Sequence, residues 1–163
     1  MMKEKLEEFN GQRFSCLQCG ECCRSRNVPV TMEDIKQISR VKGPDEFIVI
    51  YGEHKLVLDR REWDSGCIFL RDTQCTIHDM KPLVCDLYPV CISVNSLLEG
   101  SSPVILKDGS EMYMYVDVSC SGVGKGEPLD EEEIEEKARL LNIYMLNTDI
   151  GSLIGWVEDE KRI

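Results

Sequence analysis

The stretch FSCLQCGECCRSR, residues 14–26, places four cysteines within eight positions. Their spacing is C-x2-C-x2-C-C from Cys16 to Cys23, so that Cys22 and Cys23 are direct neighbours. A C-x2-C turn lets two thiolates converge on one ion, with each sulfur about 2.3 Å from a zinc. The same turn also holds iron–sulfur clusters. The repeated turn therefore predicts a metal site in this loop.

The remaining cysteines support a metal-binding protein rather than a disulfide framework. The chain has nine cysteines, an odd number, and the first residues are charged with no apolar stretch suited to a signal peptide. Its apolar runs are also too short to span a bilayer. We therefore expect a cytoplasmic protein, whose thiols stay reduced and are available as metal ligands. The other five cysteines are Cys67, Cys75, Cys85, Cys91 and Cys120.

Length and charge limit the partners and the number of domains. The 163 residues suit one domain with one core. The net charge of −11 disfavours nucleic acid and anionic membranes as partners, because their phosphates would be repelled. We expect a single cysteine-cluster domain over residues 1–163, with a core at 14–126 and a C-terminal helix at 130–147.

Three segments predict helices. In TMEDIKQISRV, residues 31–41, Thr31 and Asp34 form a capping-box pattern, and Ile35, Ile38 and Val41 would be buried. The segment KPLVCDLYP, residues 81–89, predicts one or two helical turns bounded by prolines. The last helix begins after Asp130, a capping residue followed by three glutamates that favour the positive end of the helix dipole.

Other segments predict short hairpins. GCIFLRDTQCTIH, residues 66–78, would turn near Asp72-Thr73, and VILKDGSEMYMYVDV, residues 104–118, would turn at Asp108-Gly109. EFIVIYGEHKLVLD, residues 46–59, fits either two strands around Gly52 or a helix that begins at Pro44-Asp45. The expected fold class is α+β: a small irregular single domain with short hairpins and a few helices, organised around cysteine–metal sites.

The doubled cysteine raises the question of how two adjacent sulfurs are used. Adjacent side chains diverge in both helices and strands, so we expect Cys22 and Cys23 to serve two neighbouring centres, or one sulfur to bridge two metals. In the first hairpin, Leu70 opposite Cys75 would also place Cys67 opposite His78. Cys67 and Cys75 would then point to opposite faces, unless a bulge interrupts the strand. A vicinal disulfide is disfavoured because it needs a strained ring and an oxidising environment.

The segments CLQCGECC, GCIFL, QCTIHDMKPLVCDLYP and CSGVGKG together resemble the YkgJ-type cysteine-cluster family, also described as the CxxCxxCC zinc- or iron-chelating domain. The resemblance runs from about Cys16 to Gly126. It implies a small metal-binding domain of mostly unassigned role, and some larger relatives are linked to protein lysine methylation, including that of flagellin. This chain has Asp86 where the family often has arginine. By position, the resemblance implies eight metal ligands: Cys16, Cys19, Cys22, Cys23, Cys67, Cys75, Cys85 and Cys120.

Several other residues have weaker claims to a role. Cys91 lies outside the recurrent set and is expected to be a spare thiol in the core. Arg24 and Arg26 could offset the charge of nearby thiolates or could simply be solvated. We expect His78 to be a hydrogen-bonded core or outer-shell residue, and His54 to be solvated in a turn.

The sequence therefore predicts a metal-binding protein of redox or structural role. Eight cysteines equal two four-ligand sets, which hold zinc, iron or iron–sulfur clusters in two adjacent centres. Iron is preferred over zinc because the triple cysteine run resembles a cluster loop. A protein partner of unknown identity is expected. The alternative is an iron-dependent enzyme or an accessory subunit in protein modification such as lysine methylation.

Overall fold

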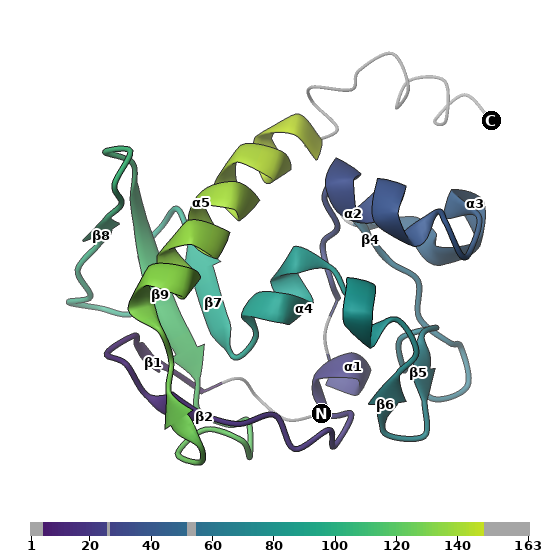
Figure 1. Ribbon diagram of the computed structural model, residues 1–163, viewed down its shortest axis with the longest axis horizontal. Helices are drawn as coiled ribbons and strands as arrows, with labels where there is room; N and C mark the ends of the chain where they lie inside the picture. Colours follow the sequence, from purple (N-terminus) through teal and green to yellow (C-terminus); the bar gives the residue numbers. More distant parts are fainter. Residues whose placement is uncertain (1–4, 26, 52–54, 149–163) are drawn as a thin grey trace.

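The computed structural model describes residues 5–25, 27–51 and 55–148 (Figure 1). Three residues with predicted roles or positions, Arg26, Gly52 and His54, lie outside these ranges. Within the described part of the chain, no helix has both the length and the hydropathy needed to cross a bilayer.

One half of the molecule is a small antiparallel sheet covered by a long helix. Strand β9 (Glu111–Asp117) lies between β1 (Leu6–Glu8) and β7 (Val90–Ser93), and β8 (Val104–Ile105) also pairs with β9. Helix α5 (Glu131–Thr148) lies across this sheet (Figure 1). Its Ile134, Ala138 and Leu141 are buried against Met112, Met114 and Val116 of β9, as expected for an amphipathic helix on a half-buried sheet. We call this group of buried side chains the sheet core.

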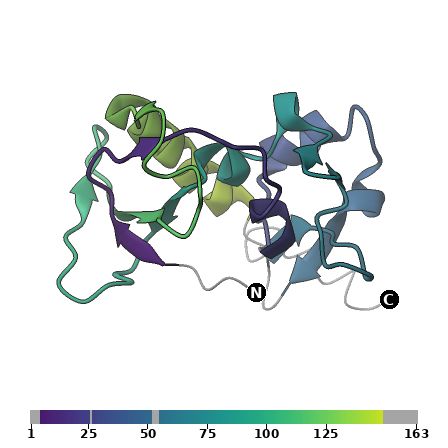
Figure 2. The same cartoon turned by 90° about the horizontal axis from the view of Figure 1, so that it is seen from below.

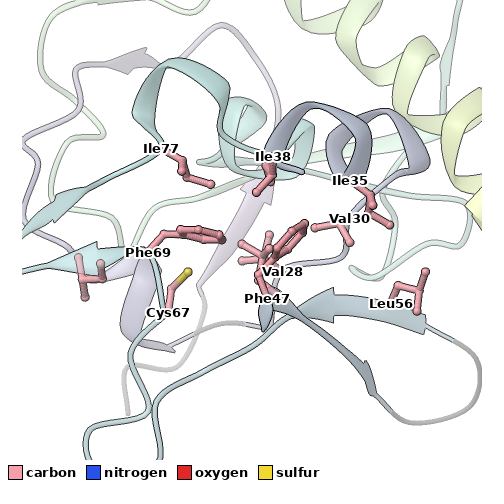
Figure 3. Close-up of a cluster of buried hydrophobic side chains, with 11 residues drawn as sticks. Val28, Val30, Ile35, Ile38, Phe47, Leu56, Cys67, Phe69 and Ile77 are labelled. Carbon is pink, nitrogen blue, oxygen red and sulfur yellow. The ribbon is translucent and has the colours of Figure 1, made fainter. Parts of the chain in front are cut away.

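The other half is built from shorter elements. Helices α2 (Met32–Ile38) and α3 (Pro44–Phe47) pack with the hairpin of β3 (Ile48–Tyr51) and β4 (Lys55–Leu58). Their buried side chains surround Phe47 and Phe69, whose ring centroids lie 5.8 Å apart. Figure 3 shows that the Cys67 side chain belongs to this same group, which we call the helical core.

Several cysteine-bearing elements border the helical core, and one of them, α4 (Leu83–Leu87), also reaches the sheet core. They include α1 (Cys22–Ser25), α4 and the hairpin of β5 (Leu70–Arg71) and β6 (Gln74–Cys75), followed by the 3-10 helix η1 (His78–Met80). Figures 1 and 2 show α4 between the sheet with α5 on one side and α2 on the other. Val84 of α4 packs against both cores. The last pair, β2 (Arg13–Phe14) with β10 (Glu127–Pro128), joins the cysteine loop to the glycine-rich segment before α5.

The expected α+β class is confirmed, and so are both hairpin turns and the helix caps at Thr31 and Asp130. The ambiguous segment at residues 44–59 contains both alternatives, a single helical turn and then two strands. The expected burial of Val41 is wrong, because α2 ends at Ile38 and Val41 is 60% exposed beyond it.

The capping box of α2 should contribute measurably to stability. Thr31 is fully buried, its hydroxyl accepts from the Asp34 N–H at 3.1 Å, and the Asp34 carboxylate accepts from the Thr31 N–H at 2.8 Å. We expect Thr31→Ala to lower the free energy of unfolding by about 1 kcal/mol. Thr31→Ser, which keeps the acceptor, should lose less. Urea unfolding of the metal-loaded protein followed by circular dichroism measures both, and equal losses in the two variants would contradict a role for the cap.

Candidate metal centre

All nine cysteines line one cavity of about 870 Å³, and no disulfide joins any of them. They come from the cysteine loop, the β5–β6 hairpin, α4, β7 and the turn after β9. Cys16 and Cys19 are exposed, Cys67 is buried and the other six are half-buried. Cys16 and Cys120, which lie 104 residues apart in the sequence, therefore contribute sulfurs to the same cavity.

Backbone contacts bring together a first group of cysteines, which consists of Cys22, Cys23, Cys67, Cys75 and Cys85. The Cys67 N–H donates to the Cys23 carbonyl oxygen at 2.7 Å, which ties α1 to the segment before β5. Gly20 has a φ of +77°, and a Cβ there would lie only 3.2 Å from the Thr73 Cα. Glycine thus permits both the left-handed conformation and the close approach of the loop to the β5–β6 turn. Cys75 follows this turn directly, so it lies on the same side of the cavity.

The electrostatic environment shows which thiols in this group interact. Burial raises the pKa of the Cys85 thiol, and the nearby Cys67, Cys22 and Cys75 raise it further. Burial likewise raises the pKa of Cys67 and of Cys75, with Cys22 adding to both. A thiolate at any of these positions is therefore disfavoured by both desolvation and its neighbours.

A second group forms where the glycine-rich segment lies against the cysteine loop. The Ser15 N–H donates to the Gly122 carbonyl oxygen at 3.1 Å, and a Cβ at Gly122 would overlap the Ser15 carbonyl. This approach brings Cys120 to the loop. Burial raises the pKa of the Cys120 thiol, and Cys19 and Cys22 raise it further.

Cys22 belongs to both groups, and its contact with Cys23 contradicts the expected divergence of the two side chains, whereas the use of the pair by two centres stays a prediction. A hydrogen bond between the two thiols is the main cause that raises the pKa of Cys23, ahead of burial. The side chains of these neighbours therefore do not diverge within the short helix α1. Cys22 also interacts with Cys67, Cys85 and Cys120.

The expected pairing of Cys67 with His78 is also wrong. The β5–β6 ladder has two residue pairs, and Cys67 forms a bridge with Arg60 instead. The ladder ends because the Leu70 N–H donates back to the Cys67 carbonyl oxygen at 2.9 Å, which turns the chain. Cys67 and Cys75 consequently share one environment, so this hairpin does not direct them to separate centres.

Two further residues, which the sequence did not indicate, hold Cys120 in place. The Tyr88 hydroxyl donates to the Asp117 carboxylate at 2.9 Å and is also hydrogen-bonded with the Cys120 thiol. Asp117 is buried and accepts backbone N–H groups from Lys5 at 3.3 Å and Ser119 at 3.1 Å. Burial alone would raise the pKa of Asp117, but the hydrogen bonds from Ser119 and Tyr88 outweigh it and hold the pKa below its usual value.

The remaining candidates have different surroundings from those we expected. Arg24 donates to the Asp72 carbonyl oxygen at 3.0 Å, so it fixes the β5–β6 turn. His78 is exposed at the start of η1 and lines the cavity, so it does not lie in the core, and only the outer-shell alternative stays a prediction. Cys91 is half-buried in the cavity wall instead of lying in either core.

The donor set suits a soft metal, although the sulfurs are not yet in coordination geometry. In residues 5–25, 27–51 and 55–148, no three cysteine, histidine or carboxylate side chains are arranged to hold an ion. Thiolates select zinc, copper(I) and iron–sulfur clusters. The raised thiol pKa values favour protonated sulfurs until a cation displaces the protons. The residues therefore fit such a metal by chemistry and by location in one cavity.

Comparison with known proteins agrees with this donor set. Residues 15–121 match the CxxCxxCC family, described as "Putative zinc- or iron-chelating domain". The chain belongs to this family. All eight expected ligands lie within the matched residues. The chain is also 30% identical over 165 aligned positions to "Uncharacterized protein MJ0661" of Methanocaldococcus jannaschii, which covers 86% of this chain and 90% of that protein. No solved structure matches.

The hydrogen bond between the Tyr88 hydroxyl and the Cys120 thiol should orient this sulfur toward a bound metal. We expect Tyr88→Phe to keep the fold but to release metal several-fold faster to a chromogenic chelator, because loss of an outer-shell partner weakens affinity by about 10–100-fold. The control is Tyr113→Phe, which changes another half-buried tyrosine, located on strand β9. Equal release rates for the two variants would contradict a positioning role, and unfolding curves of the metal-free proteins would identify a general loss of stability.

Proposed function

We propose that this CxxCxxCC protein binds zinc or iron through two four-sulfur sets that meet at Cys22. The observation that carries the proposal is the position of Cys22, which interacts with thiols of both groups in the cavity. The first set would be Cys23, Cys67, Cys75 and Cys85. The second set would be Cys16, Cys19, Cys22 and Cys120.

Both the contacts among the thiols and the spacing of the motif support the second set. Cys19 and Cys120 interact with each other, and Cys120 also interacts with Cys22. Cys16 lies one C-x2-C turn before Cys19 and lines the same cavity. Because Cys22 and Cys23 are in contact, the two sets would be adjacent, and the Cys22 sulfur is the best candidate for a ligand that both centres share.

The arrangement supports a structural or a redox role. Zinc in such sites stabilises a fold, whereas iron–sulfur clusters carry electrons. A structural role is supported by the first set, because its four cysteines belong to the helical core or pack against it, so that bound metal would fasten α1, α4 and the β5–β6 hairpin to this core. A redox role is supported by Cys16 and Cys19, whose exposure would let a partner approach the second centre.

The cytoplasm is the proposed location, because nine cysteines without a disulfide suit a reducing compartment. The alternative, an iron-dependent enzyme or an accessory subunit in protein modification, has no specific contact among the described residues in its favour. We therefore do not adopt it.

Metal identity can be decided directly. We expect protein purified without oxygen to contain iron and to absorb visible light, because the C-x2-C-x2-C run supplies three thiolates close together as cluster loops do. Elemental analysis and visible absorption of the same sample measure this. A colourless sample with stoichiometric zinc would assign zinc in place of iron, and a sample without either metal would refute the proposed function.

Substitutions at single cysteines test the two sets. We expect Cys85→Ser to lose about half of the bound metal, because it removes a ligand from one four-sulfur set. Cys22→Ser should lose more than Cys85→Ser, because Cys22 contacts both sets. Cys91→Ser is the matched control from the same cavity and should keep the full metal content. Full metal in Cys23→Ser together with a loss in Cys91→Ser would show that the assigned ligands are wrong.

A further inference from the structure

The cavity extends beyond the sulfurs along strand β7. Six consecutive residues line it, residues 90–95, which include all of β7. Successive side chains of a strand point to opposite faces, so a cavity that contacts consecutive residues must lie along the edge of the strand. β7 is the last strand in the sheet order β1-β9-β7, and no other described strand pairs with its outer edge.

The backbone groups of this outer edge can be identified. The Phe9 N–H donates to the Met114 carbonyl oxygen at 3.0 Å, whereas the Asp117 N–H donates to the Pro89 carbonyl oxygen at 2.9 Å. Alternate residues of β9 therefore face β1 and β7 in turn, and Tyr115 faces β7.

Cys91 lies opposite Tyr115 in the register, so the backbone groups of Cys91 point toward β9. The N–H and C=O groups of Val90 and Ile92 then point the other way, toward the cavity. No hydrogen bond from another described residue reaches these four groups. They form a row of donors and acceptors that a further strand could use.

The walls of this end of the cavity suit a peptide more than a metal. Besides the cysteines, the cavity lining includes Met112, Leu141, Ser93, Asn95 and Asn142, which are uncharged. A volume of about 870 Å³ falls in the usual range for ligand pockets and far exceeds the space of one or two ions. The chain carries a net charge of −11. The cavity lining holds the carboxylates of Glu21, Asp86 and Asp117 and the ammonium group of Lys81. Asp86 is paired with Lys81 and with Lys137, and the carboxylates still outnumber the one lysine of the lining, so a basic segment would be attracted.

We propose that β7 binds an extended basic peptide segment of a partner protein by strand addition, within the cavity that contains the cysteines. The backbone of the segment would pair with Val90 and Ile92, and alternate side chains would give specificity. This binding mode is independent of which metal the cysteines hold.

The test uses the metal-loaded protein and a displayed library of nine-residue random peptides. Selected peptides are synthesised with a fluorescent label, and their dissociation constants are measured by anisotropy. Ile92→Pro removes an outward N–H, and proline is tolerated on edge strands where the N–H faces away from the sheet. Ile92→Ala is the control, because it shortens the same side chain but keeps the N–H. We expect the selected peptides to be basic. Their dissociation constants should be at least about tenfold higher for Ile92→Pro than for Ile92→Ala.

A second measurement keeps the proposal testable if Ile92→Pro does not fold. Each selected peptide is also made in two forms, one N-methylated at its odd-numbered residues and one at its even-numbered residues. One form should lose binding to the unchanged protein and the other should keep it, because only one row of the peptide's N–H groups would face β7. Equal binding by both forms, or by Ile92→Pro and Ile92→Ala, would overturn strand addition. Dimerisation that Ile92→Pro abolishes would assign the edge to a second copy and would also overturn the proposal. Metal content measured on the same samples distinguishes these failures from a failure of metal binding.

Discussion

The crowding of thiols in one partly buried cavity is the constraint on which the rest of the structure depends. Each thiolate formed there loses hydration and meets the charge of its neighbours, so burial and nearby cysteines both raise the thiol pKa values. A group of sulfurs placed in this way is poorly suited to remain ionised by itself. A soft cation removes the conflict, because it replaces the protons and neutralises the thiolates.

Two close backbone approaches create this crowding. Gly20 lets the cysteine loop lie on the β5–β6 turn, and Gly122 lets the segment after Cys120 lie on Ser15. A side chain at either glycine would push one cysteine-bearing segment away from the loop. The sulfurs are thus gathered by contacts of the main chain.

Local sequence rules predicted the elements well, and they failed where tertiary contacts decide the geometry. Thr31 with Asp34, and Asp130 before α5, are short-range patterns whose hydrogen bonds form within one turn. The divergence of Cys22 and Cys23 was inferred from ideal helix and strand periodicity, but α1 is only one turn long and the two thiols meet. The pairing of Cys67 with His78 assumed a longer ladder than the chain forms. Tyr88 and Asp117 lie 29 residues apart, and their common contact with Cys120 depends on the register of β9 beside β7.

Helix α4 links the chemistry of the sulfurs to the rest of the fold. It carries Cys85, its Val84 packs against both cores, and Tyr88 follows its last turn. The chain then enters β7, whose outer edge lines the same cavity. A change in the coordination of Cys85 would therefore act on a helix that contacts both cores and precedes the open strand directly. Cys85, Val84 and Tyr88 therefore bring the sulfur cavity, both cores and the start of β7 together within one short segment of the chain.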